Sequence, residues 1–256
     1  MIRSIGILTG GAIERMTSAA SKSKASAAAM RLSMAAENYL LSIYQLEELG
    51  RRVSPSQLAE QLKRLPEGEG LGTSLPSVTG MLRRLTREGL IEMDKNKEID
   101  LTKLGREAAE SMVRRHRLAE LLVVDVLDVD LCNAHEEAHR LEHAMSPLLE
   151  EKIRQKLGNP KASPFGDPIP GSGHAASNDS ILLSEAVQGN EYTVDRIPED
   201  DQALLEYLVP FGFIPGRGVK LTEAAPYRGV IKLECDGEEV VVGYEVAERI
   251  WLHQTD

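Results

Sequence analysis

The chain has 256 residues, a net charge of −10 and an aromatic content of 4%. This length accommodates two or three small domains, and no apolar run approaches the roughly 20 residues of a membrane-spanning helix, so we expect no membrane partner. The negative charge argues against a general nucleic-acid binder. However, residues 1–33 carry five basic and one acidic residue, whereas residues 181–256 carry six basic and fifteen acidic ones. This gradient is compatible with a local DNA-binding surface.

The N-terminal segment and the cysteines indicate where in the cell the protein is located. Residues 1–33 are rich in Ala, Ser and Lys and lack a sustained apolar period, which predicts a disordered tail rather than a secretory signal. Cys132 and Cys235 lie far apart and form no CxxC motif, although a fold that brought them together would let them pair. We therefore expect a reducing, cytoplasmic location.

Residues 34–107 show the pattern of three helices and a hairpin. Apolar residues recur at helical spacing over residues 39–46, and Ser54-Pro55 marks the start of a second helix. A third helix is expected from Pro76 to about Glu88, after a Pro- and Gly-rich loop at residues 66–74. Strand-like runs on both sides of DKNK then predict a β-hairpin. This order is the layout of a winged helix-turn-helix domain.

The third predicted helix is a basic surface in an acidic chain. Small and hydroxyl-bearing residues at a helix N-terminus suit base edges in the major groove, and arginines further along suit phosphates. An ordinary solvated helix can also carry arginines, but the adjoining hairpin favours DNA recognition. The candidate DNA-binding residues are Ser74, Pro76, Ser77, Arg83, Arg84 and Arg87.

Residues 108–157 are predicted to form a helical domain that binds a metal. Thr102 can cap a long helix that carries His116 and Glu120 four residues apart. The following stretch, HEEAHRLEH at 135–143, places on one face of a helix the side chains of His135, His139, Glu142 and His143. Histidines that neighbours satisfy are the alternative, but so many ligand types on facing helices favour a transition-metal site.

The predicted helices also carry more apolar surface than two helices can bury between themselves. The VVDVL stretch is one such surface, and the side chains of Leu141, Met145, Leu148 and Leu149 are expected to extend the apolar side of the second helix. We therefore predict a homodimer.

The letters HEEAH also match HExxH, the zinc-peptidase motif, with Glu136 in the position of the general base. A zinc metallopeptidase is thus the alternative function. A metzincin would have glycine and histidine where this chain has Glu142 and Met145, which disfavours that subclass. A metal-independent DNA binder and a metal buffer also stay open.

The C-terminal half changes character. Residues 158–180 are rich in Pro, Gly and Ser and are predicted to form a linker. Residues 181–256 contain short strand-like runs, with a hairpin signal at Asp236-Gly237 and one helix at about 199–209, and predict a small β-barrel. The expected fold class is mainly α with α+β parts.

Five stretches, taken in order, resemble the diphtheria toxin repressor / manganese transport regulator family of metal-dependent repressors from residue 34 onward. They are AENYLLSIYQLEE, LPSVTGMLRRLTREGLI, RRHRLAELLVVDVLDVD, HEEAHRLEHAMS and SPFGDPIPG. The resemblance implies a homodimeric repressor of metal-uptake or metal-homeostasis genes that binds a palindromic operator in double-stranded DNA when Mn²⁺ or Fe²⁺ is bound. It also implies that the barrel at residues 181–256 is SH3-like (FeoA-like), and it implies no enzymatic activity.

The resemblance also implies two metal sites. A second, ancillary site would use His116, Glu120 and His135, and a primary site would use Asn38, His139, Glu142 and His143. The family usually has Cys or Glu at position 139 and Met or Asp at position 38. Positions through which barrels of iron-type members supply ligands fall on Arg196 and Glu199, and an arginine cannot ligate a metal. The nitrogen- and oxygen-only primary site leans towards Mn²⁺ over Fe²⁺, and it also accepts Zn²⁺ and Co²⁺.

Overall fold

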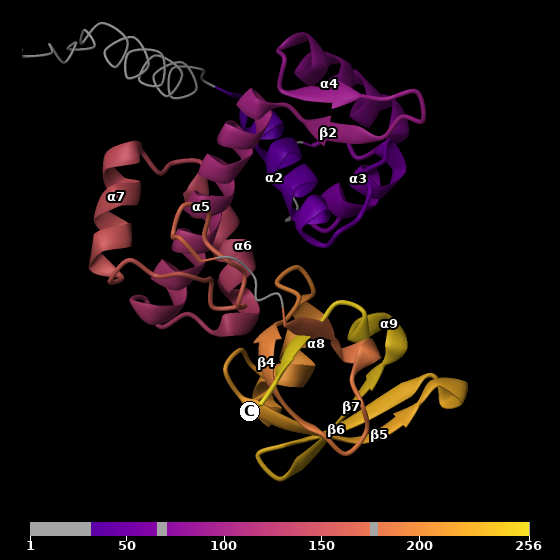
Figure 1. Cartoon of the computed structure of the whole chain (residues 1–256). Coiled ribbons are helices and arrows are strands. Elements are labelled where there is room, and N and C mark those ends of the chain that lie inside the picture. Colours follow the sequence, from indigo (N-terminus) through magenta and orange to yellow (C-terminus); the bar gives the residue numbers. More distant parts are fainter. Residues whose placement is uncertain (1–31, 66–70, 175–178, 256) are drawn as a thin grey trace, which may run out of the picture.

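The computed structural model describes residues 32–65, 71–174 and 179–255, which form an N-terminal domain, a helical domain and a C-terminal β-domain (Figure 1). The predicted fold class is confirmed. Most of the predicted tail at 1–33 and part of the loop at 66–74 lie outside the described residues. Within the described residues, no helix is long and apolar enough to cross a membrane.

The N-terminal domain consists of three helices and a two-stranded antiparallel hairpin. These elements are α2 (Met34–Glu48), α3 (Pro55–Leu62), α4 (Leu75–Arg87), β1 (Ile91–Met93) and β2 (Ile99–Leu101). The Ser54 side chain accepts from the backbone N–H of Gln57, and the Gln57 side chain accepts from that of Ser54. This reciprocal cap fixes the start of α3, as the Ser-Pro pair predicts. Leu58 of α3 and Leu82 of α4 lie in the shared core.

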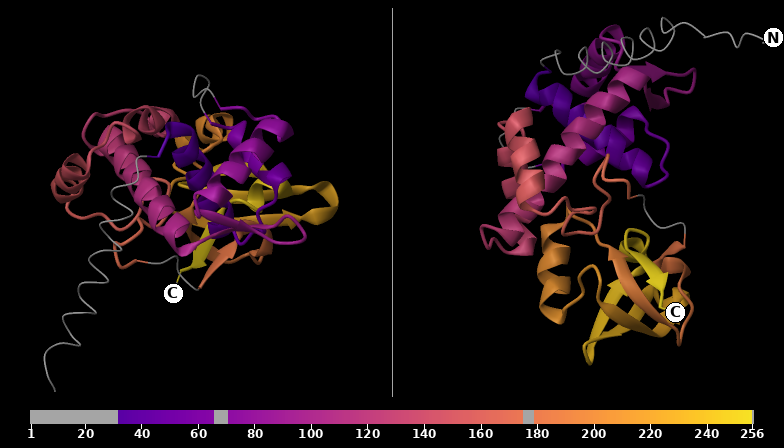
Figure 2. Two further views of the ribbon diagram at one scale, coloured as in Figure 1. Left: turned by 90° about the horizontal axis from the view of Figure 1, so that it is seen from above. Right: turned by 60° about the vertical axis from the view of Figure 1, so that its left-hand side comes forward.

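Helix α5 (Lys103–Asp125) connects the N-terminal and helical domains (Figure 2). The Thr102 side chain caps it by accepting from the N–H of Gly105, as predicted. Its first turns belong to the N-terminal core, where Ala109 is fully buried, so the boundary predicted at residue 107 falls inside a continuous helix. A Cβ on Gly105 would lie 1.7 Å from the carbonyl oxygen of Leu90, and hence only glycine allows this close approach.

The helical domain contains α5, α6 (Leu131–Glu142) and α7 (Pro147–Lys156). Two sequence expectations need correction here. The helix expected at 135–143 begins four residues earlier and ends at Glu142, so that His143 is its C-cap. Its apolar side does not continue to Leu149, because Ser146 caps the separate helix α7 by accepting from the Leu149 N–H.

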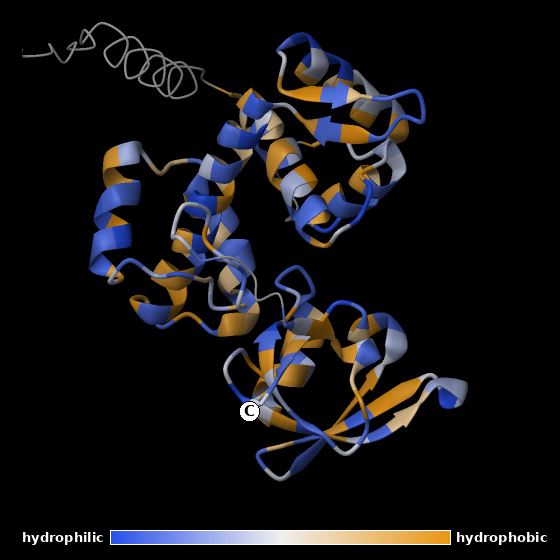
Figure 3. Cartoon of the chain, in the orientation of Figure 1, coloured by the Kyte–Doolittle hydropathy of each residue, from blue (hydrophilic) through white to orange (hydrophobic). Residues whose placement is uncertain are grey.

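Apolar side chains stay uncovered on this domain. Leu127, after α5, is 58% exposed and Leu148, on α7, is 71% exposed, while Met145 is buried. Figure 3 colours the hydrophobic positions orange. This surface agrees with the surplus of apolar area that the sequence predicts.

The C-terminal domain is a six-stranded antiparallel sheet in the order β3-β8-β4-β5-β6-β7. The strands are β3 (Ser180–Leu182), β4 (Glu191–Arg196), β5 (Gly218–Ala225), β6 (Val230–Cys235), β7 (Glu238–Gly243) and β8 (Trp251–Gln254). The helices of this domain are α8 (Gln202–Leu208) and α9 (Tyr244–Ala247). Single 3₁₀ turns lie at Leu183–Glu185, Val209–Phe211 and Pro226–Arg228.

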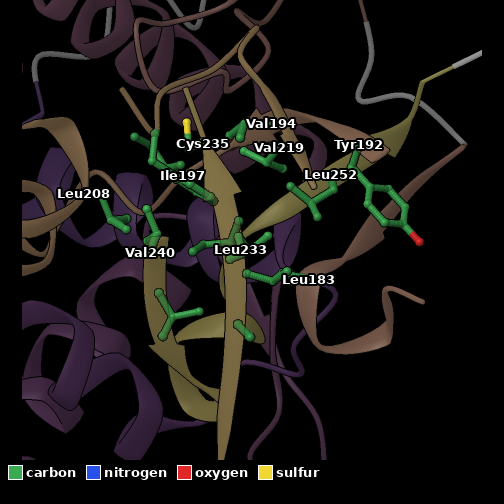
Figure 4. Packing of buried hydrophobic residues seen from close by; sticks show 14 of the residues in the cluster. Leu183, Tyr192, Val194, Ile197, Leu208, Val219, Leu233, Cys235, Val240 and Leu252 are labelled. Atoms are coloured by element: carbon green, nitrogen blue, oxygen red, sulfur yellow. The ribbon is translucent and has the colours of Figure 1, made fainter. Parts of the chain in front are cut away.

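The β6–β7 hairpin turns at Asp236 and Gly237, as predicted, and both residues have positive φ, of 50° and 87°. A two-residue turn with positive φ at both positions matches the twist of the strands. Leu233, Val240 and Leu208 pack in the core of this domain (Figure 4).

The segment predicted as a linker is partly packed. Phe165 is buried in the core of the β-domain, and its carbonyl accepts from the N–H of Ile197 at 3.0 Å. The β-domain also contacts the N-terminal domain, because Arg64 and Asp200 form an ion pair of 3.0 Å and Gln45 donates to Glu199 at 2.5 Å. Gln61, at the end of α3, also donates to Asp200 at 3.4 Å, and the loop before α8 therefore touches α2 and α3.

Candidate metal centre

Helices α5 and α6 pack together and bury a cluster of ionisable side chains between them. His116 and Glu120 are one turn apart on α5, and the facing side of α6 supplies His135, His139 and Glu142. All five are buried, and three of them have no exposed surface. Because burying such groups is costly unless they have partners or a metal, this arrangement requires an explanation.

The first group of ligand types lies towards the β-domain. His116 Nε2 is 3.1 Å from Glu120 Oε1, and His135 Nδ1 is 3.5 Å from the same oxygen. Glu199, from the loop before α8, places Oε1 3.7 Å from His116 Nε2. These four residues come close enough together to hold one ion. The structure thus brings the three candidate ancillary ligands together with Glu199, the barrel position that the resemblance indicates.

The second group lies towards α2. Glu142 Oε1 is 2.9 Å from His139 Nδ1 and 3.4 Å from His143 Nε2, and these three residues form another candidate set of ligands. The other ring nitrogen of His143, Nδ1, is 2.7 Å from Glu37 Oε2. Asn38, the remaining predicted primary ligand, is fully buried on α2 next to Glu37.

The two groups share side chains rather than standing apart. His116 Nδ1 lies 2.5 Å from Glu142 Oε2, so one histidine touches a carboxylate of each group. The imidazole rings of His116, His135 and His139 have centroids 4.7–4.9 Å apart. The resemblance implies two metal sites, and the structure places their candidate ligands in one continuous cluster.

Burial and proximity set the protonation of the cluster. Burial would lower the pKa of His116, but the carboxylates of Glu120 and Glu142 hold that pKa well above its usual value. Burial would raise the pKa of Glu142, yet the His116 and His139 rings hold it well below the usual range. Burial lowers the pKa of His139 to about 4. Without a metal, His116 is therefore a cation between two carboxylates, and His139 is neutral with a lone pair for a ligand.

The donor set fits a transition metal. Within the described part of the chain, both ring nitrogens of His135, Nε2 of His139 and Oε2 of Glu120 are buried and make no hydrogen bond. Imidazole nitrogen with carboxylate oxygen suits Mn²⁺, Fe²⁺, Co²⁺ and Zn²⁺, whereas Ca²⁺ and Mg²⁺ prefer oxygen alone. The unpaired ligand atoms point to a function as metal ligands.

Glu37 and Arg115 were not among the predicted site residues. Arg115 forms a 2.8 Å ion pair with Glu37, which in turn contacts His143, and so α5, α2 and α6 meet at one carboxylate. The signal in the sequence was an acidic residue next to Asn38 in a mostly apolar helix. Arg196, which the sequence rules out as a ligand, lies over the ring of Trp251 instead, at 4.4 Å from its centroid.

The peptidase alternative finds no support in this geometry. Glu136 is half-buried on α6, and its carboxylate forms an ion pair with Arg140. A general base must be free to take a proton from the water on the metal, whereas the carboxylate of Glu136 is held by Arg140.

The candidate DNA-binding residues lie together on an exposed face of α4. Ser74 caps the helix by accepting from the N–H of Ser77 at 3.4 Å. Arg84 is held by Glu88 at 2.8 Å, while Arg83 and Arg87 form no ion pair with any residue that the structure describes. A helix that presents cations without acidic partners suits a phosphate backbone.

Comparisons with known proteins agree with this architecture. Residues 31–99 match the family described as iron dependent repressor, N-terminal DNA binding domain; residues 102–171 match its metal binding and dimerisation domain, and residues 181–253 match the FeoA domain. The chain is 34% identical to the iron-dependent repressor IdeR of Mycobacterium leprae over 227 residues, which cover 84% of this chain and 94% of that protein. It is 37% identical to the diphtheria toxin repressor of Corynebacterium glutamicum over 190 residues, 72% of this chain and 79% of that protein.

Solved structures show the same likeness. A manganese-dependent transcriptional repressor in complex with manganese is 32% identical, with a TM-score of 0.76 over 86% of this chain and 100% of that chain. The manganese regulator SloR is 30% identical, with a TM-score of 0.72 over 88% of this chain and 100% of that chain. These relatives are transcriptional repressors rather than enzymes. The chain therefore belongs to the iron-dependent repressor family of metal-dependent transcriptional repressors.

Proposed function

We propose that this chain is a cytoplasmic, homodimeric repressor that binds a palindromic operator in double-stranded DNA when Mn²⁺ or Fe²⁺ is bound. The observation that carries the proposal is the contact between His143 and Glu37. It joins the candidate primary site to α2, which packs against α3 and, through it, α4 in the DNA-binding domain. The state of the cluster is therefore linked to the placement of the recognition helix α4.

Asn38, His139, Glu142 and His143 would hold the regulatory ion, whose positive charge would bring the Glu142 carboxylate and the two imidazole rings together. His116, Glu120 and His135 would hold a second ion, with Glu199 as a ligand from the β-domain. The absence of sulfur from the primary set favours Mn²⁺, and the same donors accept Zn²⁺ and Co²⁺. The metal activates DNA binding only if it binds the DNA-competent arrangement of the domains more tightly than it binds the other arrangements.

Ser74, Pro76 and Ser77 are proposed to face base edges, because they form the exposed N-terminus of α4. Arg83, Arg84 and Arg87 are proposed to face phosphates. The exposed apolar side chains of α7 and the α5–α6 turn suit the homodimer contact, since such a surface is unfavourable in water. A two-fold dimer presents two α4 helices, which is why a palindromic operator is expected.

The test is a DNA-binding titration of the full-length protein on its own promoter, by fluorescence anisotropy. Mn²⁺, Fe²⁺ under anaerobic conditions, Co²⁺ and Zn²⁺ are compared at one salt concentration, because phosphate contacts make the affinity depend on salt. DNA affinity should rise with Mn²⁺ or Fe²⁺, and His143→Ala should abolish that rise. Full metal-dependent binding by His143→Ala would refute the proposal. Equal binding in the presence of a chelator would instead indicate a metal-independent DNA binder.

A further inference from the structure

The rings of His116, His135 and His139 form a nearly equilateral triangle inside the α5–α6 interface. The centroids are 4.9 Å apart for His116 and His135, and 4.7 Å for each of the other two pairs. One ring nitrogen of each residue lies within 4.8 Å of the others. The triangle takes two members from the ancillary set and one from the primary set, so it belongs to neither proposed site.

We propose that these three imidazoles form a third way of binding a metal, a single-ion site selective for Zn²⁺. Nitrogen ligands at 2.0–2.1 Å from a tetrahedral ion lie about 3.4 Å apart. Because the nitrogens lie at most 4.8 Å apart, reaching this separation requires each of them to move inward by no more than roughly 0.8 Å, a distance within the reach of side-chain rotation. Within the described residues, the Nε2 atoms of His135 and His139 are buried and make no hydrogen bond.

Glu142 orients one of the three rings for this site and lies close to a second. One carboxylate oxygen is hydrogen-bonded to His116 Nδ1 at 2.5 Å, and the other lies 2.9 Å from His139 Nδ1 without a hydrogen bond. A carboxylate that accepts a hydrogen bond from Nδ1 of His116 selects the tautomer whose Nε2 carries the lone pair, and such partners commonly support metal-bound histidines. Glu142 thereby becomes an outer partner of the ion instead of its ligand.

Glu120 supplies the fourth donor. Its Oε1 is 3.1 Å from His116 Nε2 and 3.5 Å from His135 Nδ1, within the same buried space. Three imidazoles and one carboxylate give a four-coordinate, nitrogen-rich set, which matches the tetrahedral preference of Zn²⁺. Mn²⁺ favours oxygen ligands and octahedral coordination, and therefore gains less from this set.

The three-histidine site excludes the two-site arrangement, because it takes His139 from the primary set and His116 and His135 from the ancillary set. It involves neither His143 nor Glu37, the pair that reaches α2. Zinc would thus bind as one ion per chain without engaging the DNA-binding domain. Only this last consequence rests on the proposed function; the ligand set stands independently of it.

The experiment measures the affinity of metal-free, full-length protein for the first equivalent of Zn²⁺ by competition with a chromophoric chelator. His135→Ala and His139→Ala should each weaken the affinity for the first Zn²⁺ ion by about 100-fold. Loss of a partner that only supports a ligand already costs up to about this much. His143→Ala and Glu199→Gln should leave it within about threefold of wild type, since they alter only the primary or the ancillary set. One equivalent of Co²⁺ should give the intense visible bands of a four-coordinate ion, and circular dichroism confirms that each variant is folded.

The alternatives give different patterns. Losses in His139→Ala and His143→Ala but not in His135→Ala would place the first zinc ion in the primary site. Losses in His135→Ala and Glu199→Gln but not in His139→Ala would place it in the ancillary site; either result overturns the proposal. A rise in DNA affinity with the first equivalent of Zn²⁺ would also contradict it. If neither Mn²⁺ nor Fe²⁺ promotes DNA binding while the zinc pattern holds, the proposed function fails and the three-histidine site survives.

Discussion

The contact between His143 and Glu37 offers the sharpest test of how the metal centre acts on DNA binding. Glu37→Gln keeps the shape of the side chain but removes its charge. Two charge-assisted interactions are then weakened, the 2.7 Å contact with His143 and the 2.8 Å ion pair with Arg115. All three side chains are mostly buried, with exposed fractions of 16% or less, so solvent screens these interactions little.

The magnitude follows from the chemistry of these two contacts. A hydrogen bond to a charged group contributes about 1.5–3 kcal/mol, and a neutral one about 0.5–1.5 kcal/mol. Neutralising Glu37 therefore costs about 1 kcal/mol at each contact, or about 2 kcal/mol in total. If both contacts belong to the DNA-competent arrangement, operator affinity at saturating Mn²⁺ falls by roughly 30-fold.

Glu47→Gln is the matched control. Glu47 lies on the same helix and forms a 2.7 Å ion pair with Arg106, away from the metal centre. The assay is anisotropy on the operator at saturating Mn²⁺, with denaturant unfolding of both variants to compare stability. Operator affinities that are equal for the two variants would refute the role assigned to Glu37.

Three further predictions concern pH, salt and packing. Carboxylate partners raise the pKa of His116, and a metal that binds this ring must displace its proton. Below the raised pKa, the affinity for a metal at the site that includes His116 should therefore rise by about tenfold per pH unit. Calorimetric metal titrations between pH 6 and pH 8 measure this rise. By the same shift, the metal-free protein should lose stability as pH rises through the raised pKa. Arg83→Ala should reduce the slope of log affinity against log salt by about 0.9 per chain, and an unchanged slope would remove Arg83 from the phosphate contacts. Gly105→Ala should destabilise the protein by about 1–3 kcal/mol in urea unfolding, because its Cβ would meet the Leu90 carbonyl, whereas Gly80→Ala, with nothing within 4 Å, should stabilise it by up to about 1 kcal/mol.

The candidate metal ligands can be found from the sequence because helical periodicity is a local property. His135, His139 and Glu142 share a face of α6 through spacings of three and four residues, and no tertiary information is needed to see it. The end of that helix was also readable. Ser146-Pro147 carries the same signal as Ser54-Pro55, but the apolar spacing across it suggested one continuous face.

The contacts between residues of different helices and domains cannot be predicted from the sequence in the same way. Glu37 reaches His143 across 106 residues of sequence, and Glu199 reaches Gln45 across 154. No periodicity encodes such pairs, because they depend on how the domains dock. The merging of the two predicted sites has the same origin: the distance between His116 and Glu142 is set by the packing of α5 on α6.

Metal selectivity in this protein cannot rest on affinity alone. Sites of nitrogen and oxygen ligands generally bind Zn²⁺ more tightly than Mn²⁺, so a selective manganese response depends on geometry, on ligand type or on the supply of each metal. The position of His139 provides a physical basis for this. With Glu142 and His143 it serves the set that reaches α2 through Glu37, and with His116 and His135 it serves a set that does not. Mn²⁺ prefers oxygen ligands and higher coordination numbers and therefore stabilises the set with Glu142 and His143. Zn²⁺ prefers four ligands rich in nitrogen and therefore stabilises the set with His116 and His135. A cysteine or glutamate at position 139 would not complete three imidazoles, and His139→Glu should therefore make Zn²⁺ a better activator of DNA binding than it is for the wild type.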